Sequence, residues 1–253
     1  MYSIKHSETK VPAHLFIHAY QNKYSKELRF FILLKLNFHQ GKFLNTKEIL
    51  QDLQAQDQIK SHKTIIKYLD KLIKLKLIKY NTKTKHYQLI SYDKIRINLG
   101  LYSRKAIRVD KTTYKNVYAL TGAVIFALLH SDFWRRVHKD KVVVLKGATY
   151  KSKSFRTSQK KSPAPVSIYG VNSIYKISVT SVVRLKKLAV NLKLLTVKHI
   201  YSEYPVDKFI VEENASFDLS KNNVVFRKGA YYLQEIDHIT PNIFFSKRKN
   251  VVP

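Results

Sequence analysis

The sequence predicts a mainly α-helical protein with small β-hairpins, in the α+β class, built from two similar units. Three helical patterns followed by a hairpin pattern occupy residues 24–93. A helix of similar sequence begins again at Ser178, 117 residues after Ser61. The 253 residues of the chain are enough for two small domains, each with its own core.

The charge of the chain indicates its partner. Lysine and arginine number 47 against 17 aspartates and glutamates, which gives a net charge of +30. Such a chain attracts polyanions, and nucleic acid is the first partner to expect. An AT-rich genome also raises the lysine content, but that bias favours glutamate as well, and acidic residues are scarce here. We therefore expect double-stranded DNA as the partner.

Two helices are expected before residue 56. The segment Lys26–Phe38 is apolar enough for a mostly buried helix, and Gly41 can end it. The next helix lies in TKEILQDLQ, where Asn45 or Thr46 can cap the first turn. Glu48 stands early in that helix, where the helix dipole favours an acid.

A third helix is expected from Ser61, whose side chain can accept a hydrogen bond from the amide of Thr64. One apolar stripe of this helix faces a core and consists of Ile65, Tyr68, Leu72 and Leu75. Its opposite face is basic. Two strands, Leu77–Tyr80 and His86–Ile90, then form a hairpin around the polar tip NTKTK.

This order of three helices and a hairpin over residues 24–92 resembles a winged helix, a variant of the helix-turn-helix. The resemblance implies that the third helix enters the major groove of DNA and that the hairpin touches the flanking backbone. Lys76 departs from the pattern, because many such domains have a glycine before the first strand of the hairpin. The departure leaves the boundary between helix and strand less certain than the fold.

The third helix has a counterpart later in the chain. SHKTIIKYLDKLIKLKLI, Ser61–Ile78, aligns without a gap with SVTSVVRLKKLAVNLKLL, Ser178–Leu195. The apolar stripe recurs as Val182, Leu185, Ala189 and Leu192. Two copies of one unit would leave this similarity, and chance likeness between two amphipathic helices is the alternative. Tyr118–His130 and Ser173–Ile177 would be the first and second helices of the second unit.

The second wing should follow Leu195. The segment SEYPVDKFIVEENASFD there holds five of the 17 acidic residues, so we expect it to face solvent or the other half of the protein rather than phosphate. A hairpin over Val224–Phe226 and Ala230–Ile236, around RKG, is better placed to act as a wing.

Two further patterns lie between the units. Ile95, Ile97, Leu99 and Leu101 alternate with polar residues and predict a half-buried strand, and Val142–Leu145 is another candidate strand. The stretch KGATYKSKSFRTSQKKSPAP, residues 146–165, has six basic residues and no acid. It is typical of a flexible basic arm or of a solvated loop.

The expected division of the chain follows from these patterns. Residues 1–23 form an N-terminal extension, 24–93 the first winged-helix domain and 94–110 a connecting strand or linker. Residues 111–245 form a second winged-helix-like domain with the basic arm inserted at about 146–165, and 246–253 form a basic tail.

Candidate contact residues follow from the helix faces and the charge. Lysine and arginine on the exposed face of a helix in the major groove can donate to guanine O6 and N7. The base-reading candidates are His62, Lys63, Lys67, Thr180, Arg184 and Lys187, with Asn191 as a further addition. Phosphate-contact candidates are Lys71, Lys74, Lys83, Lys85, Lys151, Lys153, Arg156, Lys160, Lys161, Lys247, Arg248 and Lys249. For each of these alone, a solvated surface charge is the alternative.

The sequence gives no pattern for an enzyme, a cofactor or a metal site. A glycine-rich phosphate loop, paired carboxylates in an apolar setting and a nucleophile elbow are all missing, and there is no cysteine. Carboxylates scattered along the sequence, as in a nuclease or recombinase, remain the alternative. His14 and His18 lack a third ligand. The longest apolar run, Val117–Leu129, is too short to cross a bilayer, so we expect a cytoplasmic, nucleoid-associated protein without a membrane partner.

Two reading units on one chain would form a pseudo-dimer that spans two adjacent half-sites. This arrangement resembles plasmid-type replication initiators, which are built from two winged helices. The sequence thus predicts a DNA-binding protein for replication initiation or transcription regulation in a phage or mobile element, with self-association or replication and transcription machinery as further partners. The alternative is a structural protein of a nucleoid or virion that binds nucleic acid without reading its sequence.

Overall fold

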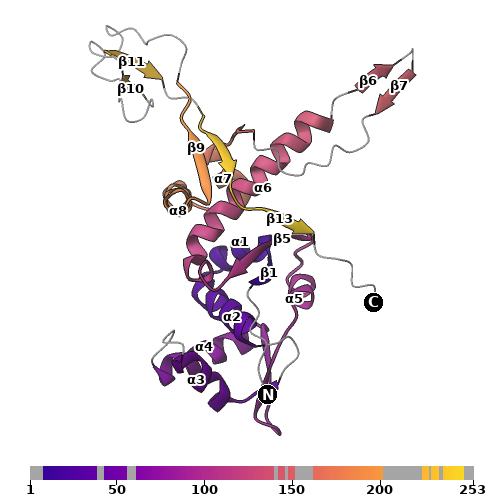
Figure 1. Ribbon diagram of the computed structural model, residues 1–253, viewed down its shortest axis with the longest axis vertical. Coiled ribbons are helices and arrows are strands. Elements are labelled where there is room, and N and C mark those ends of the chain that lie inside the picture. Colours follow the sequence, from indigo (N-terminus) through magenta and orange to yellow (C-terminus); the bar gives the residue numbers. More distant parts are fainter. Residues whose placement is uncertain are drawn as a thin grey trace. The chain divides into compact units, whose positions relative to one another are not determined.

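The computed structural model describes residues 8–38, 43–55, 61–139, 142–145, 148–151, 162–201, 224–227, 229–233 and 236–247. Within these ranges the protein is α+β, with eight α-helices and small antiparallel sheets (Figure 1). The chain divides into two compact units, Met1–Val124 with Ile243–Pro253, and Ile125–Asn242.

Three distant segments share one sheet in the first unit. Strands β1 (Glu8–Pro12), β5 (Lys105–Asp110) and β13 (Phe245–Lys247) lie in the order β1-β5-β13, and both pairings are antiparallel. Helix α1 (Ala13–Gln21) follows β1 and buries an apolar face. Residues expected to form an extension, a linker and a tail therefore contribute to the same layer of the first unit.

Three helices and a second sheet follow α1 in the first unit. The elements are α2 (Ser25–Asn37), β2 (Phe43–Leu44), α3 (Thr46–Ala55), α4 (His62–Lys74), β3 (Ile78–Asn81) and β4 (His86–Leu89). The strands pair in the order β2-β4-β3. Buried side chains from all three helices form the core, among them Leu28, Phe31, Ile49, Leu53, Ile65 and Leu69. The helices and the hairpin expected here are confirmed, with ends shifted by one or two residues.

The helix starts follow the sequence only in part. Asn45 caps α3 in a reciprocal arrangement, because its Oδ1 accepts from the amide of Glu48 at 2.8 Å and Glu48 Oε2 accepts from the amide of Asn45 at 3.2 Å. The side-chain cap expected of Ser61 is wrong. The amide of Thr64 donates instead to the backbone carbonyl of Ser61, at 3.1 Å.

A left-handed residue separates α4 from β3. Lys76 has φ 55°, the conformation that glycine usually supplies at this position. Its amide donates to the carbonyl of Ile73 and the amide of Leu77 donates to the carbonyl of Leu72, both at 2.9 Å. The positive charge of the lysine suits the negative end of the helix. The boundary between helix and strand is therefore sharp although no glycine is present.

The strand expected from the alternation at Ile95–Leu101 is wrong. Residues Tyr92–Asn98 form helix α5, and the hydroxyl oxygen of Ser91 caps it by accepting from the amide of Lys94 at 3.3 Å. Tyr92 and Ile95 face the core, three residues apart, whereas Ile97 is 68% exposed. The alternating pattern wrongly predicted a strand because Ile97, one of its apolar residues, lies in solvent.

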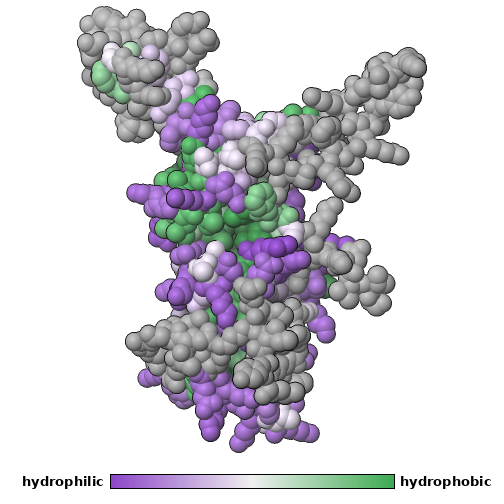
Figure 2. Space-filling view, viewed as in Figure 1, coloured by the Kyte–Doolittle hydropathy of each residue, from purple (hydrophilic) through white to green (hydrophobic). Residues whose placement is uncertain are grey.

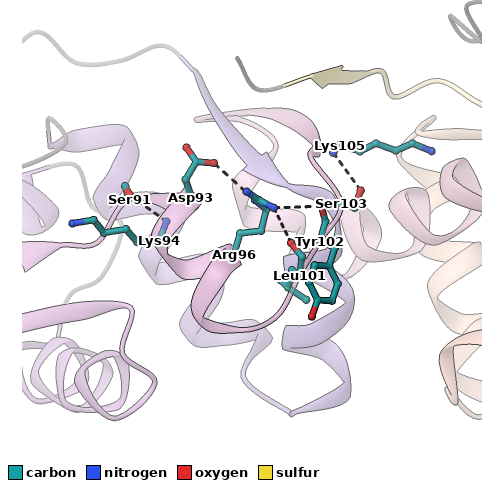
Figure 3. Close-up of polar contacts among 8 residues, drawn as sticks. All are labelled: Ser91, Asp93, Lys94, Arg96, Leu101, Tyr102, Ser103 and Lys105. Carbon is teal, nitrogen blue, oxygen red and sulfur yellow. Dashed lines mark hydrogen bonds and ion pairs between the residues drawn. The ribbon is translucent and has the colours of Figure 1, made fainter. Parts of the chain in front are cut away.

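Arg96 fixes the loop that leads from α5 to β5 (Figure 3). Its guanidinium donates to the carbonyls of Leu101 at 3.2 Å and Tyr102 at 3.3 Å, and Asp93 lies 4.0 Å from its Nε. The Arg96 side chain thus satisfies two carbonyls of the loop that have no partner in a β-ladder.

Asp110 makes the turn at the end of β5. Its Oδ1 accepts from the amides of Thr112 and Thr113, at 2.9 and 2.8 Å, and from both threonine hydroxyls. Burial alone would raise the pKa of this carboxyl, but the hydrogen bonds from the threonines outweigh it and lower the pKa to about 2. The turn directs the chain through a 3-10 turn (Tyr114–Asn116) into α6 (Val117–Lys139).

Helix α6 extends well beyond the expected Tyr118–His130. Among the described helices, Tyr114–Val137 is the one long and apolar enough to cross a membrane, and 72% of its most apolar window is buried inside the protein. This burial is typical of the core helix of a folded domain.

The second unit contains a three-stranded sheet and two helices beside α6. The elements are β8 (Ala164–Pro165), α7 (Ile168–Tyr175), α8 (Val179–Asn191), β9 (Leu195–Lys198) and β12 (His238–Pro241). The strands pair in the order β8-β12-β9. Helix α7 begins earlier than the expected Ser173, because the hydroxyl oxygen of Ser167 caps it by accepting from the amide of Gly170.

Two hairpins are inserted into this unit. β6 (Val142–Leu145) pairs with β7 (Ala148–Lys151), so the start of the expected basic arm is a strand. β10 (Val224–Arg227) pairs with β11 (Ala230–Leu233). That hairpin was expected as the second wing, but the strands that pair directly after α8 are β9 and β12, and the hairpin lies between them in the chain.

The two units repeat the same local structure. α8 begins and ends 117 residues after α4, and β9 begins 117 residues after β3. Lys193 has φ 55°, as Lys76 has, and the amide of Leu194 donates to the carbonyl of Ala189 at 2.9 Å. The two sheets also have the same strand order. In the first, β2 precedes α3 and pairs with β4, which pairs with β3 after α4. In the second, β8 precedes α7 and pairs with β12, which pairs with β9 after α8. One expected stripe residue differs, since Leu192 is 44% exposed.

The left-handed lysines predict a stability change of unusual sign. Replacing Lys76 with glycine removes the steric cost of a Cβ at positive φ, and the gain exceeds the added entropy of the unfolded glycine. We expect Lys76→Gly to raise the free energy of unfolding by about 0.5–1 kcal/mol in chemical denaturation. Lys74→Gly, two residues earlier in the right-handed helix, is the control and should lower it by about 0.5–1 kcal/mol. Equal losses in both variants would contradict the left-handed turn.

Candidate nucleic-acid interface

The outer face of α4 carries the base-reading candidates of the first unit. His62, Lys63 and Lys67 are exposed, while Ile65 and Leu69 on the opposite face are fully buried. Helical periodicity therefore holds the cations away from the core, where they can approach a ligand. No acidic side chain in the described part of the chain pairs with Lys63 or Lys67.

The same face also carries an acidic residue, Asp70, which was not among the candidates predicted from the sequence. Asp70 is exposed and follows Ile66 and Lys67 by one helical turn. A carboxylate at this position disfavours a phosphate, but it can accept a hydrogen bond from cytosine N4 in the major groove. Asp70 thus makes this face better suited to base edges than to phosphates alone.

Lys71, a phosphate-contact candidate, forms an ion pair within the protein. Its Nζ donates to Glu27 Oε1 at 2.6 Å, and the glutamate side chain is only 5% exposed while that of the lysine is 49% exposed. The hydrogen bond to Glu27, together with its negative charge, raises the pKa of Lys71. Tyr68 packs on Phe30 beside this pair, with ring centroids 5.3 Å apart. These two contacts fix the rotation of α4 against α2.

The β3–β4 hairpin presents a basic tip. Asn81 Oδ1 accepts from the amides of Lys83 at 3.0 Å and Thr84 at 3.3 Å, and Lys85 takes a left-handed conformation with φ 53°. The side chains of Lys79, Lys83 and Lys85 are exposed. The hairpin tip is hydrophilic in Figure 2. Lys83 and Lys85 lie where the sequence placed them, at the end of a rigid hairpin. Lys74 is also exposed, in the last turn of α4.

Helix α8 presents the second set of candidates. Thr180, Arg184 and Lys187 are exposed, and Val182, Leu185 and Ala189 face the core. Ser178 caps the helix, since its Oγ accepts from the amide of Ser181 at 3.4 Å. Arg184 occupies the position of Lys67, and Lys187 that of Asp70, 117 residues earlier. The second face is therefore similar in position and more basic. Asn191 is exposed at the position of Lys74.

A buried ion pair fixes α8 to the start of β12. The Lys186 ammonium donates to Asp237 Oδ2, and both side chains are 12% exposed. His199 Nδ1 lies 2.7 Å from Asp237 Oδ1. Burial alone would raise the pKa of Asp237, but hydrogen bonds from Lys186 and His199 outweigh it and the pKa is lowered. Because His199 follows β9 and Asp237 precedes β12, the cluster closes the base of the segment that carries β10 and β11.

Two side chains of α6 hold the backbone where the basic arm ends. His130 Nε2 and Trp134 Nε1 donate to the carbonyl oxygen of Ser162, at 2.8 and 3.2 Å. Burial lowers the pKa of His130, and the hydrogen bond to Ser162 offsets only part of this effect. The ring is thus neutral at pH 7, with the proton on the nitrogen that donates. The backbone at Ser162 is therefore attached to α6.

The remaining candidates are described in part or not at all. The backbones of Lys151 and Lys247 lie in β7 and β13. Outside the described residues lie Lys153, Arg156, Lys160, Lys161, Arg248 and Lys249.

Within the described ranges, no group of three histidine, aspartate or glutamate side chains could hold a metal ion. His18, which the sequence paired with His14, instead has its Nδ1 2.6 Å from the hydroxyl oxygen of Tyr24. Comparison with protein-family models, with curated proteins and with solved structures finds no match to this chain.

The Asp237 cluster predicts a pH-dependent loss of stability. Asp237→Asn leaves the buried Lys186 without its counter-charge, and we expect it to lower the free energy of unfolding by about 3 kcal/mol at pH 7. The folded pKa of Asp237 is lowered, so its contribution is complete above about pH 4, the unfolded value, and is lost as the pH falls through the folded value. The difference between wild type and variant in denaturant titrations should therefore shrink near pH 3.

The control for this experiment is Asp132→Asn, which removes an acid from an exposed pair with Arg135. This change should cost less than about 1 kcal/mol. A difference for Asp237→Asn that stays constant from pH 7 to pH 3 would contradict the assignment.

Proposed function

We propose that this chain is a DNA-binding protein that reads duplex DNA through two winged-helix units. One observation carries the proposal: a helix, a left-handed lysine turn and a strand recur at a spacing of 117 residues, each time with an exposed polar and basic helix face. The strand orders β2-β4-β3 and β8-β12-β9 support the same topology in both units. An α-helix with cations on its outer face fits the width and chemistry of the major groove.

The hairpin of the first unit has the position and charge of a wing. It follows α4 directly and carries Lys79, Lys83 and Lys85 on exposed positions. In the proposal α4 supplies base contacts and the hairpin supplies phosphate contacts. In the second unit α8 has the role of α4, and the strands β9 and β12 have the role of the hairpin strands.

The process we propose is replication initiation or transcription regulation in a phage or a mobile element such as a plasmid. Helix-turn-helix proteins commonly bind two half-sites as dimers, and two units on one chain would supply two reading helices without a dimer. The resemblance to plasmid-type replication initiators is one of architecture. The DNA sequence that the protein prefers would separate the two roles, because it would map to a replication origin or to a promoter.

The second candidate is a structural protein that binds nucleic acid without reading it. The observation that favours it is the stretch of residues 146–165, with six basic residues and no acid. Strong salt dependence does not separate the candidates, because six to ten phosphate contacts reduce affinity by about 10³–10⁵ between 50 and 200 mM salt in either case.

The experiment that separates them is selection of bound sequences from a random duplex pool at about 150 mM salt, where non-specific attraction is partly screened. An enriched motif with two half-sites supports the proposal. Tight binding without enrichment would favour the sequence-independent candidate.

Substitutions on the two helices should relax specificity in a directed way. We expect Lys67→Ala and Arg184→Ala each to lose base preference in one half-site, by about 1–3 kcal/mol for the base concerned. Lys83→Ala should weaken all sequences about equally, because a phosphate contact carries no sequence information. Lys115→Ala, an exposed lysine of the 3-10 turn, is the control and should change neither quantity. Unchanged sequence preference in both helix variants would disprove the assignment of reading helices.

A further inference from the structure

Each reading face contains an exposed apolar side chain at the same position. Ile66 on α4 is 36% exposed and Val183 on α8 is 45% exposed, and the two positions are 117 residues apart, as the helices are. Both side chains are β-branched, so they keep one side-chain rotamer in a helix and lose little freedom when they are covered.

The neighbours of these residues are the base-reading candidates. Lys63 precedes Ile66 by one turn, and Lys67 follows it directly. Thr180 and Arg184 stand in the same relation to Val183. With 3.6 residues per turn, Ile66 and Val183 lie on the same flank of each polar face, between the base-reading candidates and the half-buried Ile73 and Val190. A phosphate backbone gives such a side chain nothing to contact, whereas the major groove contains one apolar group, the C5-methyl of thymine.

We infer that Ile66 and Val183 each contact the C5-methyl group of a thymine, so that both half-sites carry a thymine at the same step relative to the base read by Lys67 or Arg184. The inference rests on the proposed function and adds a specificity determinant to it. The equivalence of the two positions carries the inference, because single exposed apolar residues are common on protein surfaces. Leu188 on α8, also 36% exposed, has no such equivalent, since Lys71 stands at the matching position of α4.

The test uses the duplex enriched by the full-length protein, with each thymine replaced singly by deoxyuridine, which lacks only the methyl group. Covering one methyl group contributes about a three- to fivefold change in affinity. We expect one thymine in each half-site at which this replacement weakens binding by that factor. Ile66→Ala should abolish the effect in one half-site and Val183→Ala in the other, which forms a double-mutant cycle for each contact.

Leu188→Ala is the matched control, with an equal initial exposure, and should leave the deoxyuridine effect intact at both half-sites. All three residues are partly exposed, and unfolding midpoints confirm that each variant is folded. Deoxyuridine effects that persist unchanged in Ile66→Ala and Val183→Ala, or that are absent at every thymine of an enriched site, would overturn the inference while leaving the proposed function in place. Failure of the pool to yield any motif would overturn both.

Discussion

The turn that follows each of the helices α4 and α8 constrains the rest of the structure. At Lys76 and Lys193 the backbone is left-handed, and the next amide returns to a carbonyl inside the helix. This geometry leads from helix to strand with only three residues between them. It fixes where β3 and β9 begin, and hence which residues pair with β4 and β12. In each unit the buried stripe of the helix faces the core of that unit. The direction of its polar face is therefore determined as well. A lysine at this turn also keeps a positive charge near the helix end, which glycine would not.

Three of the described acidic residues hold local structure together. Glu27 holds α4 through Lys71, Asp237 holds α8 through Lys186, and Asp110 forms the turn before α6. Each of these carboxylates is committed to a structural contact, which leaves much of the excess positive charge on outward faces. Such a distribution gives a protein that is attracted to a polyanion over long range, while the cations at the ends of rigid helices and hairpins give the attraction a defined geometry.

The sequence was informative where contacts are local. The period of Ile65, Tyr68, Leu72 and Leu75 predicted α4, and the alignment with Ser178–Leu195 predicted α8. The buried residues of α4 are Ile65, Leu69 and Leu72, while Tyr68 and Leu75 are half-buried. It failed where distant residues decide. Lys71 meets Glu27 across 44 positions, and β9 pairs with β12 across an inserted hairpin, so neither contact leaves a periodic signal. Ile95 and Ile97 imitate a strand because alternation over a few residues also fits a helix with one apolar residue exposed. Positive φ at a lysine is likewise invisible to residue preferences, which assign that conformation to glycine.

We propose that α4 with the β3–β4 hairpin in the first unit, and α8 in the second, each contact duplex DNA. Lysine acetylation of the full-length protein at about 150 mM salt, with and without a duplex and read by mass spectrometry, tests it residue by residue. We expect Lys63, Lys67, Lys83 and Lys187 to become protected, while Lys94 and Lys115 react equally in both states. Protection confined to the lysines of residues 146–165 and of the C-terminal tail would contradict this proposal and would indicate sequence-independent binding.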